Sequence, residues 1–263
     1  MSEGVAFTGE RLHEGSDLFA VDLARHRAAY EFARGRTSGG RVLDFGSGSG
    51  YGAAGLAGGD ALVVGVDRVA PDARNRGPAH FLRADLRDSP LADGAFDLVV
   101  SFQVIEHLAD PSDYLDAIAG ALAPEGTALI TTPNRQTSDG ENPFHVREYL
   151  AAELAELLRT RFAEVEVLGI GATGDVARYY AARLERIRRI VKLDPLRLRR
   201  RLPRALVEWL FGRLAIVVRS RIRSDEGLPA ATWRDFPVGP ADDACLDLLA
   251  VCRAPRATRR AGS

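Results

Sequence analysis

Short runs of apolar residues alternate along the chain with segments in which apolar residues recur every three or four positions. The continuous runs predict strands buried on both faces of a parallel sheet, and the periodic segments predict helices that cover it. This alternation indicates an α/β fold. We expect strands at residues 41–45, 61–66, 79–83, 96–102, 126–132, 164–170 and 245–252. We expect helices from Asp17 to about Arg34 and near residues 50–58, 70–76, 111–122 and 147–160.

The regular alternation ends after Ile170. An arginine-rich stretch then separates the sixth predicted strand from the seventh. We therefore expect four parts in a chain of this length. They are a helical N-terminal cap (1–40), an α/β core (41–170), a basic helical insertion or lid (171–240), and the last strand of the core with a tail (241–263).

The formal net charge of −1 hides an uneven distribution of charge. Residues 178–223 hold fourteen arginines and one lysine against three acids, so the remaining residues are net negative. A helix over "YYAARLERIRRIVKL" would place Tyr180, Leu184, Ile187 and Val191 on one side and arginines on the other. Three roles stay open: a lid with its arginines in water, a surface for anionic lipid or a phosphorylated acceptor, or an RNA site. The absence of a stacking-aromatic pattern argues against nucleic acid.

The two cysteines, Cys245 and Cys252, fall in one predicted strand, about 23 Å apart at about 3.3 Å per residue. Because a disulfide needs a much shorter separation, we expect buried, reduced thiols and a cytoplasmic protein. No signal-peptide pattern precedes residue 20, and the longest apolar run, "ALVEWLFGRLAIVV", is too short to span a membrane. We expect a soluble protein, either free in the cytoplasm or peripheral at the inner membrane face through residues 178–223.

A glycine-rich turn follows the first predicted strand in "RVLDFGSGSGYGAAGLA". Such strand–turn–helix units bind nucleotides through backbone amides. The dinucleotide fingerprint needs glycine at position 51, where this chain has Tyr51. Asp44 would repel a pyrophosphate but suits a ligand that carries an ammonium group. Asp67 ends the second strand, where an acid accepts ribose hydroxyls, and Asp85 follows the third strand, where it suits an adenine amino group.

These motifs together resemble the class I S-adenosylmethionine-dependent methyltransferases, above all the small-molecule group that includes the ubiquinone-biosynthesis enzymes. The likeness covers roughly Arg41 to Asn134, through "VLDFGSGSGYG", "GVD", "RADL", "FDLVVSFQVIEHLADP" and "LAPEGTALITTPN" in order. It implies a Rossmann-like seven-stranded sheet, mostly parallel with an antiparallel last strand, helices on both faces, and a helical insertion before that strand.

The same resemblance implies S-adenosylmethionine as cofactor. The glycine loop would approach its methionine moiety with Asp44 near the amino group, Asp67 would take the ribose, and Asp85 with the Leu86 amide would hold the adenine. Gln103 and its neighbours would line the sulfonium side. The full set of implied cofactor residues is Asp44, Gly46, Ser47, Gly48, Gly50, Asp67, Arg68, Asp85, Leu86 and Gln103.

Methyl transfer from a sulfonium mainly needs a nucleophile held about 3–3.5 Å from the methyl carbon. A hydroxyl acceptor must also lose its proton, and histidine suits that role. His107 and His145 follow the fourth and fifth strands, at the sheet edge where ligands bind. We predict His145, ahead of His107, as the base or a substrate contact. A structural role, in the "EHL" turn for His107 or at a helix start for His145, is the alternative.

Glu106, His107 and His145 could also ligate a metal. Gln103 stands where metal-binding relatives carry a second glutamate, and it is a poorer ligand, so we expect no metal. Methylation of a nucleic-acid base is not expected. The Asn/Asp-Pro-Pro-aromatic tetrapeptide of amino-methylating enzymes is missing, and both cysteines lie far from the donor motifs.

The segments "FTGERLHEGSDLFAVDLARHRAAYEFA" and "NPFHVREY" resemble bacterial methyltransferases associated with surface-polysaccharide biosynthesis. This resemblance implies a sugar hydroxyl as acceptor, on a surface glycan or a lipid-linked glycan. Arg11, His26 and Arg147 are then candidates for the substrate rim, each with a structural role as the alternative. Two other functions stay open: methylation of a small lipophilic acceptor such as a quinone precursor or polyketide, and a non-catalytic S-adenosylmethionine-binding module.

Overall fold

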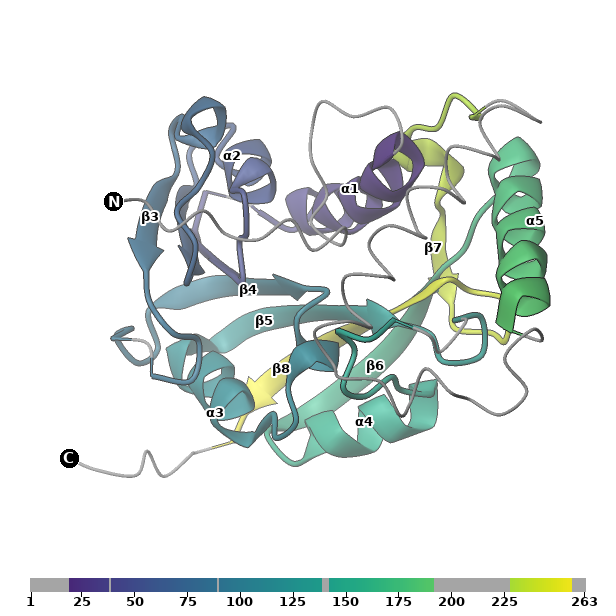
Figure 1. The fold of residues 1–263 in the computed structure, drawn as a ribbon. Helices are drawn as coiled ribbons and strands as arrows, with labels where there is room; N and C mark the ends of the chain where they lie inside the picture. The colour runs from purple at the N-terminus through teal and green to yellow at the C-terminus, as the bar shows by residue number, and fades with distance from the viewer. Residues whose placement is uncertain (1–18, 38, 89, 139–141, 192–227, 257–263) are drawn as a thin grey trace.

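The structure, a computed structural model, describes residues 19–37, 39–88, 90–138, 142–191 and 228–256. Arg11 and most of the basic segment lie outside these residues. One eight-stranded sheet runs through the molecule in the order β3-β2-β1-β4-β5-β8-β6-β7 (Figure 1). Its strands are β1 (Arg41–Phe45), β2 (Leu62–Asp67), β3 (His80–Arg83), β4 (Phe96–Phe102), β5 (Leu122–Pro133), β6 (Phe162–Ile170), β7 (Val238–Pro240) and β8 (Asp247–Pro255).

Strands β1 to β5 pair in parallel, whereas β8 runs antiparallel between β5 and β6. The mostly parallel sheet with an antiparallel last strand is therefore confirmed. The sheet has one strand more than the seven expected: β7, which pairs antiparallel with β6 at the sheet edge. It is three residues long and contains Gly239 and Pro240, so it gives no apolar run that a sequence pattern could reveal.

Helices cover both faces of the sheet (Figure 1). The helices are α1 (Ala20–Arg34), α2 (Tyr51–Leu56), α3 (Ser112–Ala121), α4 (Ala151–Arg159) and α5 (Gly174–Val191). Side chains of α1, α2 and α5 form one apolar core with their face of the sheet, and side chains of α3 and α4 form a second core on the other face. The alternation of strands along the chain produces this layering, because successive crossovers place helices on either side.

Two helix predictions need correction. The helix expected at residues 70–76 is only a 3-10 turn, η2 (Ala73–Asn75), because Pro71 and Pro78 bracket too short a segment. The helix expected from residue 147 starts at Ala151, because Tyr149 pairs with Asn134 beside the sheet. In the described part of the chain, the other 3-10 turns are η3 (Ile105–His107) and η5 (Trp233–Asp235).

The two cysteines are buried and free as expected, but only Cys252 lies in the strand that was predicted to hold both. Cys245 and Cys252 are buried and unpaired with each other. Both belong to the core beneath α3 and α4, since β8 starts only at Asp247 and Cys245 precedes it. None of the helices in the described part of the chain combines the length and apolarity that a membrane crossing requires.

Candidate functional site

The glycine loop lies between the carboxyl end of β1 and the start of α2. Gly46, Gly48 and Gly50 all have positive φ angles, of 99°, 52° and 86°. A Cβ at Gly46 would lie 2.5 Å from the Val104 side chain, and one at Gly50 would lie 2.9 Å from the Phe81 ring. Backbone conformation and close packing therefore both require glycine here. The loop is a fixed backbone cradle, open on its outer side at Gly48, where a Cβ would meet nothing.

A cavity of about 930 Å³ opens beside this loop, at the carboxyl edge of the parallel strands. It continues between α1 and α5, so the glycine loop and a second, larger wall share one space. The cofactor and catalytic candidates from the sequence that line it are Gly46, Ser47, Gly48, Asp67, Leu86, Gln103, His107 and His145, and the rim candidate His26 lines it too. Those that do not line it are Asp44, Gly50, Arg68, Asp85 and Arg147.

Asp67 is oriented for a ligand by the backbone. One carboxylate oxygen accepts a hydrogen bond from the Gly48 amide and the other from the Val69 amide, both at 2.9 Å. Each oxygen keeps lone-pair capacity toward the cavity. The carboxylate thus ends β2 in the position from which a pair of ribose hydroxyls can be bound.

Asp44, by contrast, lies beneath the loop. Its side chain is fully buried, and both carboxylate oxygens accept from the Tyr30 hydroxyl at 3.1 and 3.2 Å. Burial raises the pKa of Asp44 to about 7; Asp67 adds to the rise and the Tyr30 hydrogen bond opposes it. The geometry therefore gives Asp44 a part in tying α1 to β1 and does not place it in contact with the cavity.

Asp85 does not line the cavity either. It pairs with Arg87 at 3.0 Å, and the hydrogen bonds from Arg87 lower the pKa of Asp85 to about 2. Leu86 lines the cavity beside it. Gln103 also lines the cavity and has a φ of 57°, an uncommon value for a residue other than glycine. Its backbone amide donates to the Thr131 carbonyl at 3.1 Å, which holds this conformation at the end of β4.

Aromatic side chains close one side of the cavity. His26, Tyr30, Tyr51 and Phe102 contact one another edge to face. The Tyr51 hydroxyl donates to Nδ1 of His26. Burial lowers the pKa of His26 to about 4, with Arg25 adding to the effect, so this imidazole is neutral at physiological pH. Tyr51, which the sequence marked only as the wrong residue for a dinucleotide site, is part of this wall.

His145 is held by a carboxylate. Its Nδ1–H donates to Glu148 at 2.7 Å, and Ser138 donates to the same glutamate oxygen at 2.7 Å. Asn142 donates to Nε2 of His145 at 2.9 Å. The histidine and glutamate side chains are 15% and 8% exposed. This pairing fixes the tautomer that leaves the Nε2 lone pair as acceptor. The sequence interpretation missed Glu148, although its spacing of three from His145 was visible.

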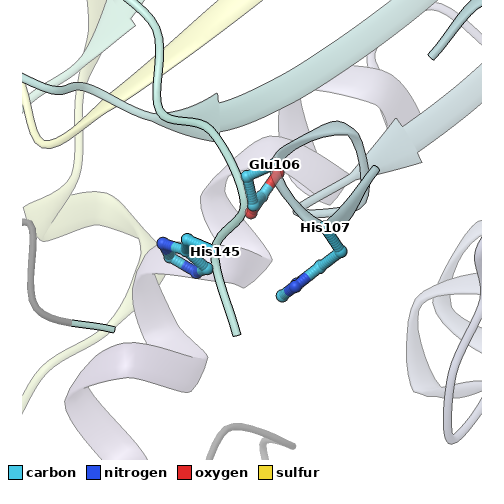
Figure 2. A group of neighbouring side chains, drawn as sticks. All are labelled: Glu106, His107 and His145. Carbon is cyan, nitrogen blue, oxygen red and sulfur yellow. The ribbon is translucent and has the colours of Figure 1, made fainter. Parts of the chain in front are cut away.

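Glu106, His107 and His145 all line the cavity and lie close to one another (Figure 2). Glu106 is fully buried, and neither carboxylate oxygen has a hydrogen-bond partner among the described residues. Burial raises the pKa of Glu106, and the nearby His107 and His145 oppose that rise. His107 is exposed, and its Nδ1–H donates to the Phe144 carbonyl at 3.0 Å. Arg147 lies outside this group, with its guanidinium over the Tyr149 ring.

The second wall of the cavity comes from α1 and α5. Asp22 accepts from the Tyr180 hydroxyl at 2.9 Å and from Arg183 at 3.0 Å, and Arg25 pairs with Asp247 at 3.3 Å. An apolar stripe of α5 continues this wall, with lining residues Ala177, Ala181, Leu184 and Ile187. The predicted stripe of Tyr180, Leu184 and Ile187 therefore does face the cavity. Arg183 also lines this wall. The amphipathic pattern did not predict this, because it placed the arginines of the helix on the opposite side, in water.

Comparison with known proteins agrees with this geometry. The sequence matches the family described as "Methyltransferase domain" over residues 20–161. A "Probable S-adenosylmethionine-dependent methyltransferase" of Mycolicibacterium smegmatis is 39% identical over 180 residues, which cover 65% of this chain and 70% of that protein. A ubiquinone biosynthesis O-methyltransferase of Caulobacter sp. is 35% identical over 129 residues, 44% of this chain and 51% of that protein.

Solved structures show the same fold. A S-adenosylmethionine-dependent methyltransferase from Thermotoga maritima superposes with a TM-score of 0.58 at 17% identity, covering 90% of this chain and 92% of that one. The glycine cradle and the carboxylate of Asp67 at the end of β2 are compatible with S-adenosylmethionine, the cofactor named for these relatives. The chain therefore belongs to the methyltransferase-domain family and is a class I S-adenosylmethionine-dependent methyltransferase.

Proposed function

We propose that this enzyme methylates a hydroxyl group of a sugar, as part of a surface glycan or a lipid-linked glycan. The observation that carries the proposal is the His145–Glu148 pair, which places a carboxylate-oriented imidazole in the same cavity as the glycine loop. A hydroxyl needs such a proton acceptor as its oxygen is alkylated, whereas a carboxylate acceptor does not.

The cofactor supplies an electrophilic methyl group on a sulfonium. Asp67 and the backbone of the glycine loop would hold it, with Leu86 and Gln103 alongside. With the cofactor bound, a lone pair of the acceptor oxygen would form the new C–O bond while the S–C bond breaks and its electrons remain on sulfur. The O–H proton passes to Nε2 of His145. Glu148 stabilises the resulting imidazolium, and Asn142, which donates to Nε2 in the structure, has to yield that position to the hydroxyl.

The second wall of the cavity supports a polyhydroxylated acceptor. Asp22, Arg25, Tyr180 and Arg183 present carboxylate, guanidinium and phenol groups within one network. Such groups can donate to and accept from several hydroxyls of one ring. His26 contributes to the same space as a structural and lining residue, through its hydrogen bond with Tyr51.

A small lipophilic acceptor is the second candidate. The stripe Ala177, Ala181, Leu184 and Ile187 gives the cavity an apolar side that would suit a quinone precursor or the lipid part of a glycan carrier. The similarity to a ubiquinone biosynthesis O-methyltransferase favours the same candidate. A non-catalytic binding module is a third possibility, against which the His145–Glu148 pair argues.

Radiolabelled methyl transfer tests the proposal. The purified protein is given the donor with three acceptor sets: oligosaccharides with free hydroxyls, catechols and hydroxybenzoates, and buffer alone. We expect label on the saccharides. His145→Gln should lower kcat by about 100-fold or more while donor affinity by calorimetry stays within about threefold. The matched control His80→Gln, in β3 away from the cavity, should keep full activity. Label on phenols alone, or full activity of His145→Gln, would overturn the proposal.

A further inference from the structure

The charged groups of the second wall are not equally accessible from the cavity. The side chains of Arg25 and Arg183 are 23% and 22% exposed, whereas those of their carboxylate partners, Asp247 and Asp22, are 3% and 6% exposed. Both arginines line the cavity. The guanidinium groups therefore form most of the charged surface that a ligand can reach on this wall, and the carboxylates that pair with them are largely hidden from it.

Arg183 keeps most of its donors for a ligand. Its Nη1 donates to both carboxylate oxygens of Asp22, at 3.0 and 3.3 Å. Among the described residues, Nε and Nη2 of Arg183 make no hydrogen bond. A guanidinium group carries five N–H donors in a planar fork that matches the oxygens of a carboxylate or a phosphate. Arg183 is thus fixed through one nitrogen and can bind an oxyanion through the other two.

A second cation lies close to Arg183. The guanidinium carbons of Arg25 and Arg183 lie 5.5 and 5.9 Å from the centroid of the same ring, that of Tyr180. Burial acts to lower the pKa of Arg183, but Asp22 and the neighbouring tyrosines outweigh it and raise this pKa above its usual value. An acidic group at this wall would therefore meet free N–H donors that stay charged, in a partly desolvated place where charge-assisted hydrogen bonds are strong.

An apolar surface adjoins Arg183 on the same helix. Ala177, Ala181 and Leu184 line the cavity at spacings of four and three residues, which place side chains on one face of a helix. Ile187, one turn after Arg183, lines the cavity as well. This wall of α5 therefore presents a guanidinium group and, beside it, a continuous apolar surface. Its chemistry matches a molecule in which an acidic group is attached to hydrocarbon.

We infer that the α5 wall is the subsite for an amphiphilic part of the acceptor, in which Arg183 binds an oxyanion and the stripe Ala177, Ala181, Leu184 and Ile187 contacts an attached apolar chain. The inference deepens the proposed function and rests on it, because this part would belong to the glycan acceptor or to its lipid carrier. The cavity of about 930 Å³ lies at the upper end of the usual range for ligand pockets, which leaves room for donor and acceptor together.

Calorimetry with simple probes tests the subsite without reference to activity. The full-length protein, saturated with S-adenosylhomocysteine, is titrated with hexyl phosphate, hexanoate, hexanol and glucose 1-phosphate. We expect hexyl phosphate or hexanoate to bind about 10-fold or more tightly than hexanol, which lacks the charge. The same probe should bind about 10-fold or more tightly than glucose 1-phosphate, which lacks the apolar chain. The preferred probe then identifies the oxyanion as a phosphate or a carboxylate.

Substitutions on α5 assign the binding to one residue. Arg183→Gln should weaken binding of the preferred anion by about 10-fold or more and leave hexanol binding unchanged, and Arg183→Lys should recover part of the loss. Arg178→Gln and Arg189→Gln are matched controls, because both arginines are exposed on the same helix, pair with acids of their own and do not line the cavity. These controls should bind every probe as the unsubstituted protein does.

A double variant covers the case in which Arg183→Gln fails to fold. Asp22→Asn combined with Arg183→Gln removes both charges, so no carboxylate is left buried without its cation, and it should show the same loss of anion binding. Equal binding of hexanol and both hexyl anions would overturn the inference, as would unchanged anion binding in folded Arg183→Gln. An equal loss of S-adenosylhomocysteine affinity in that variant would also overturn it, because Arg183 would then support the donor or the packing of α5.

The inference and the proposed function fail separately. If glucose 1-phosphate binds as tightly as hexyl phosphate, the apolar half of the subsite is wrong. If saccharide methylation by Arg183→Gln keeps its KM and kcat, the inference is wrong and the proposed function stands. If the hexyl anions bind through Arg183 but no hydroxyl is methylated, the proposed function is wrong and the subsite stands.

Discussion

Asp44 and Asp67 end neighbouring strands, yet their carboxylates meet opposite surroundings. Asp67 faces the cavity and is oriented by two backbone amides, whereas Asp44 lies beneath the loop against Tyr30. We expect Asp67→Asn to weaken S-adenosylmethionine binding by about 10-fold or more, the usual cost of losing a charged hydrogen-bond acceptor. Asp44→Asn should change affinity by less than about threefold. Isothermal titration of both variants checks this, and equal losses would show that the cavity reaches Asp44.

The buried Asp44 also predicts a pH dependence of stability. Its pKa is about 7 in the folded protein and near 3.8 in the unfolded chain, so the folded state holds the proton more tightly. The corresponding stabilisation is present below pH 3.8 and is lost as the pH rises toward 7. Relative to the unsubstituted protein, Asp44→Asn should therefore gain on the order of 2–4 kcal/mol of unfolding free energy between pH 4 and 8. Urea unfolding across this range measures the difference, and a constant difference would contradict the assignment.

The sequence predicted those site residues that belong to local motifs. The glycines and Asp67 follow or end strands, and His145 lies in the loop after β5; parallel strands bring their carboxyl ends, and the loops that follow them, to the same sheet edge. Glu148 could have been found from its spacing to His145. Arg183 and Asp22 could not, because their ion pair joins residues 161 positions apart and depends on how α5 packs over α1. For Asp44 and Asp85, the motif gave the position but not the direction of the side chain.

At the scale of elements, α2 offers a matched pair of glycines. A Cβ at Gly52 would lie 1.9 Å from the Tyr30 ring, while one at Gly55 would meet nothing within 4 Å. Gly52→Ala should therefore displace Tyr30 and cost about 1–3 kcal/mol of unfolding free energy. Gly55→Ala should stabilise the helix by about 0.5–1 kcal/mol. Thermal and urea unfolding compare the two, and similar effects at both positions would mean that α2 does not press against α1 as described.

The predicted strands agree with the structure where a continuous apolar run is also buried in the sheet. β1 and β4 occupy the predicted residues because turn-forming or polar residues lie close to both ends of their apolar runs, Gly40 and Gly46 for β1 and Gly94 and Gln103 for β4. The helix predicted at residues 70–76 was wrong. The segment has few apolar residues, and the prolines at its start and just after its end restrict the backbone more than the apolar spacing favours a helix. η3 could not be anticipated either, although it positions Glu106 and His107. A single 3-10 turn leaves no periodic signal.

For the whole molecule, strand alternation was enough to predict a sheet covered on both faces. The cavity was not predictable, since it arises where α5, carried by the insertion, returns over α1. That packing places a wall of charged and apolar groups opposite the glycine loop. The basic segment starts at Arg178 on α5, the helix that forms this wall. Under the proposed function, that is the side from which a lipid-linked acceptor would approach.

The concentration of arginines in residues 178–223 predicts attachment to anionic membranes. We expect the protein to sediment with phosphatidylglycerol vesicles, to release as salt rises from about 0.05 to 0.5 M, and to ignore phosphatidylcholine vesicles. Replacing Arg199, Arg200 and Arg201 by glutamine should weaken binding by about 10-fold or more, at roughly 1 kcal/mol per charge. The same substitution of Arg159, Arg253 and Arg256 removes equal charge elsewhere and should have little effect. Equal losses would trace binding to overall charge, and absence of sedimentation would contradict the predicted membrane attachment.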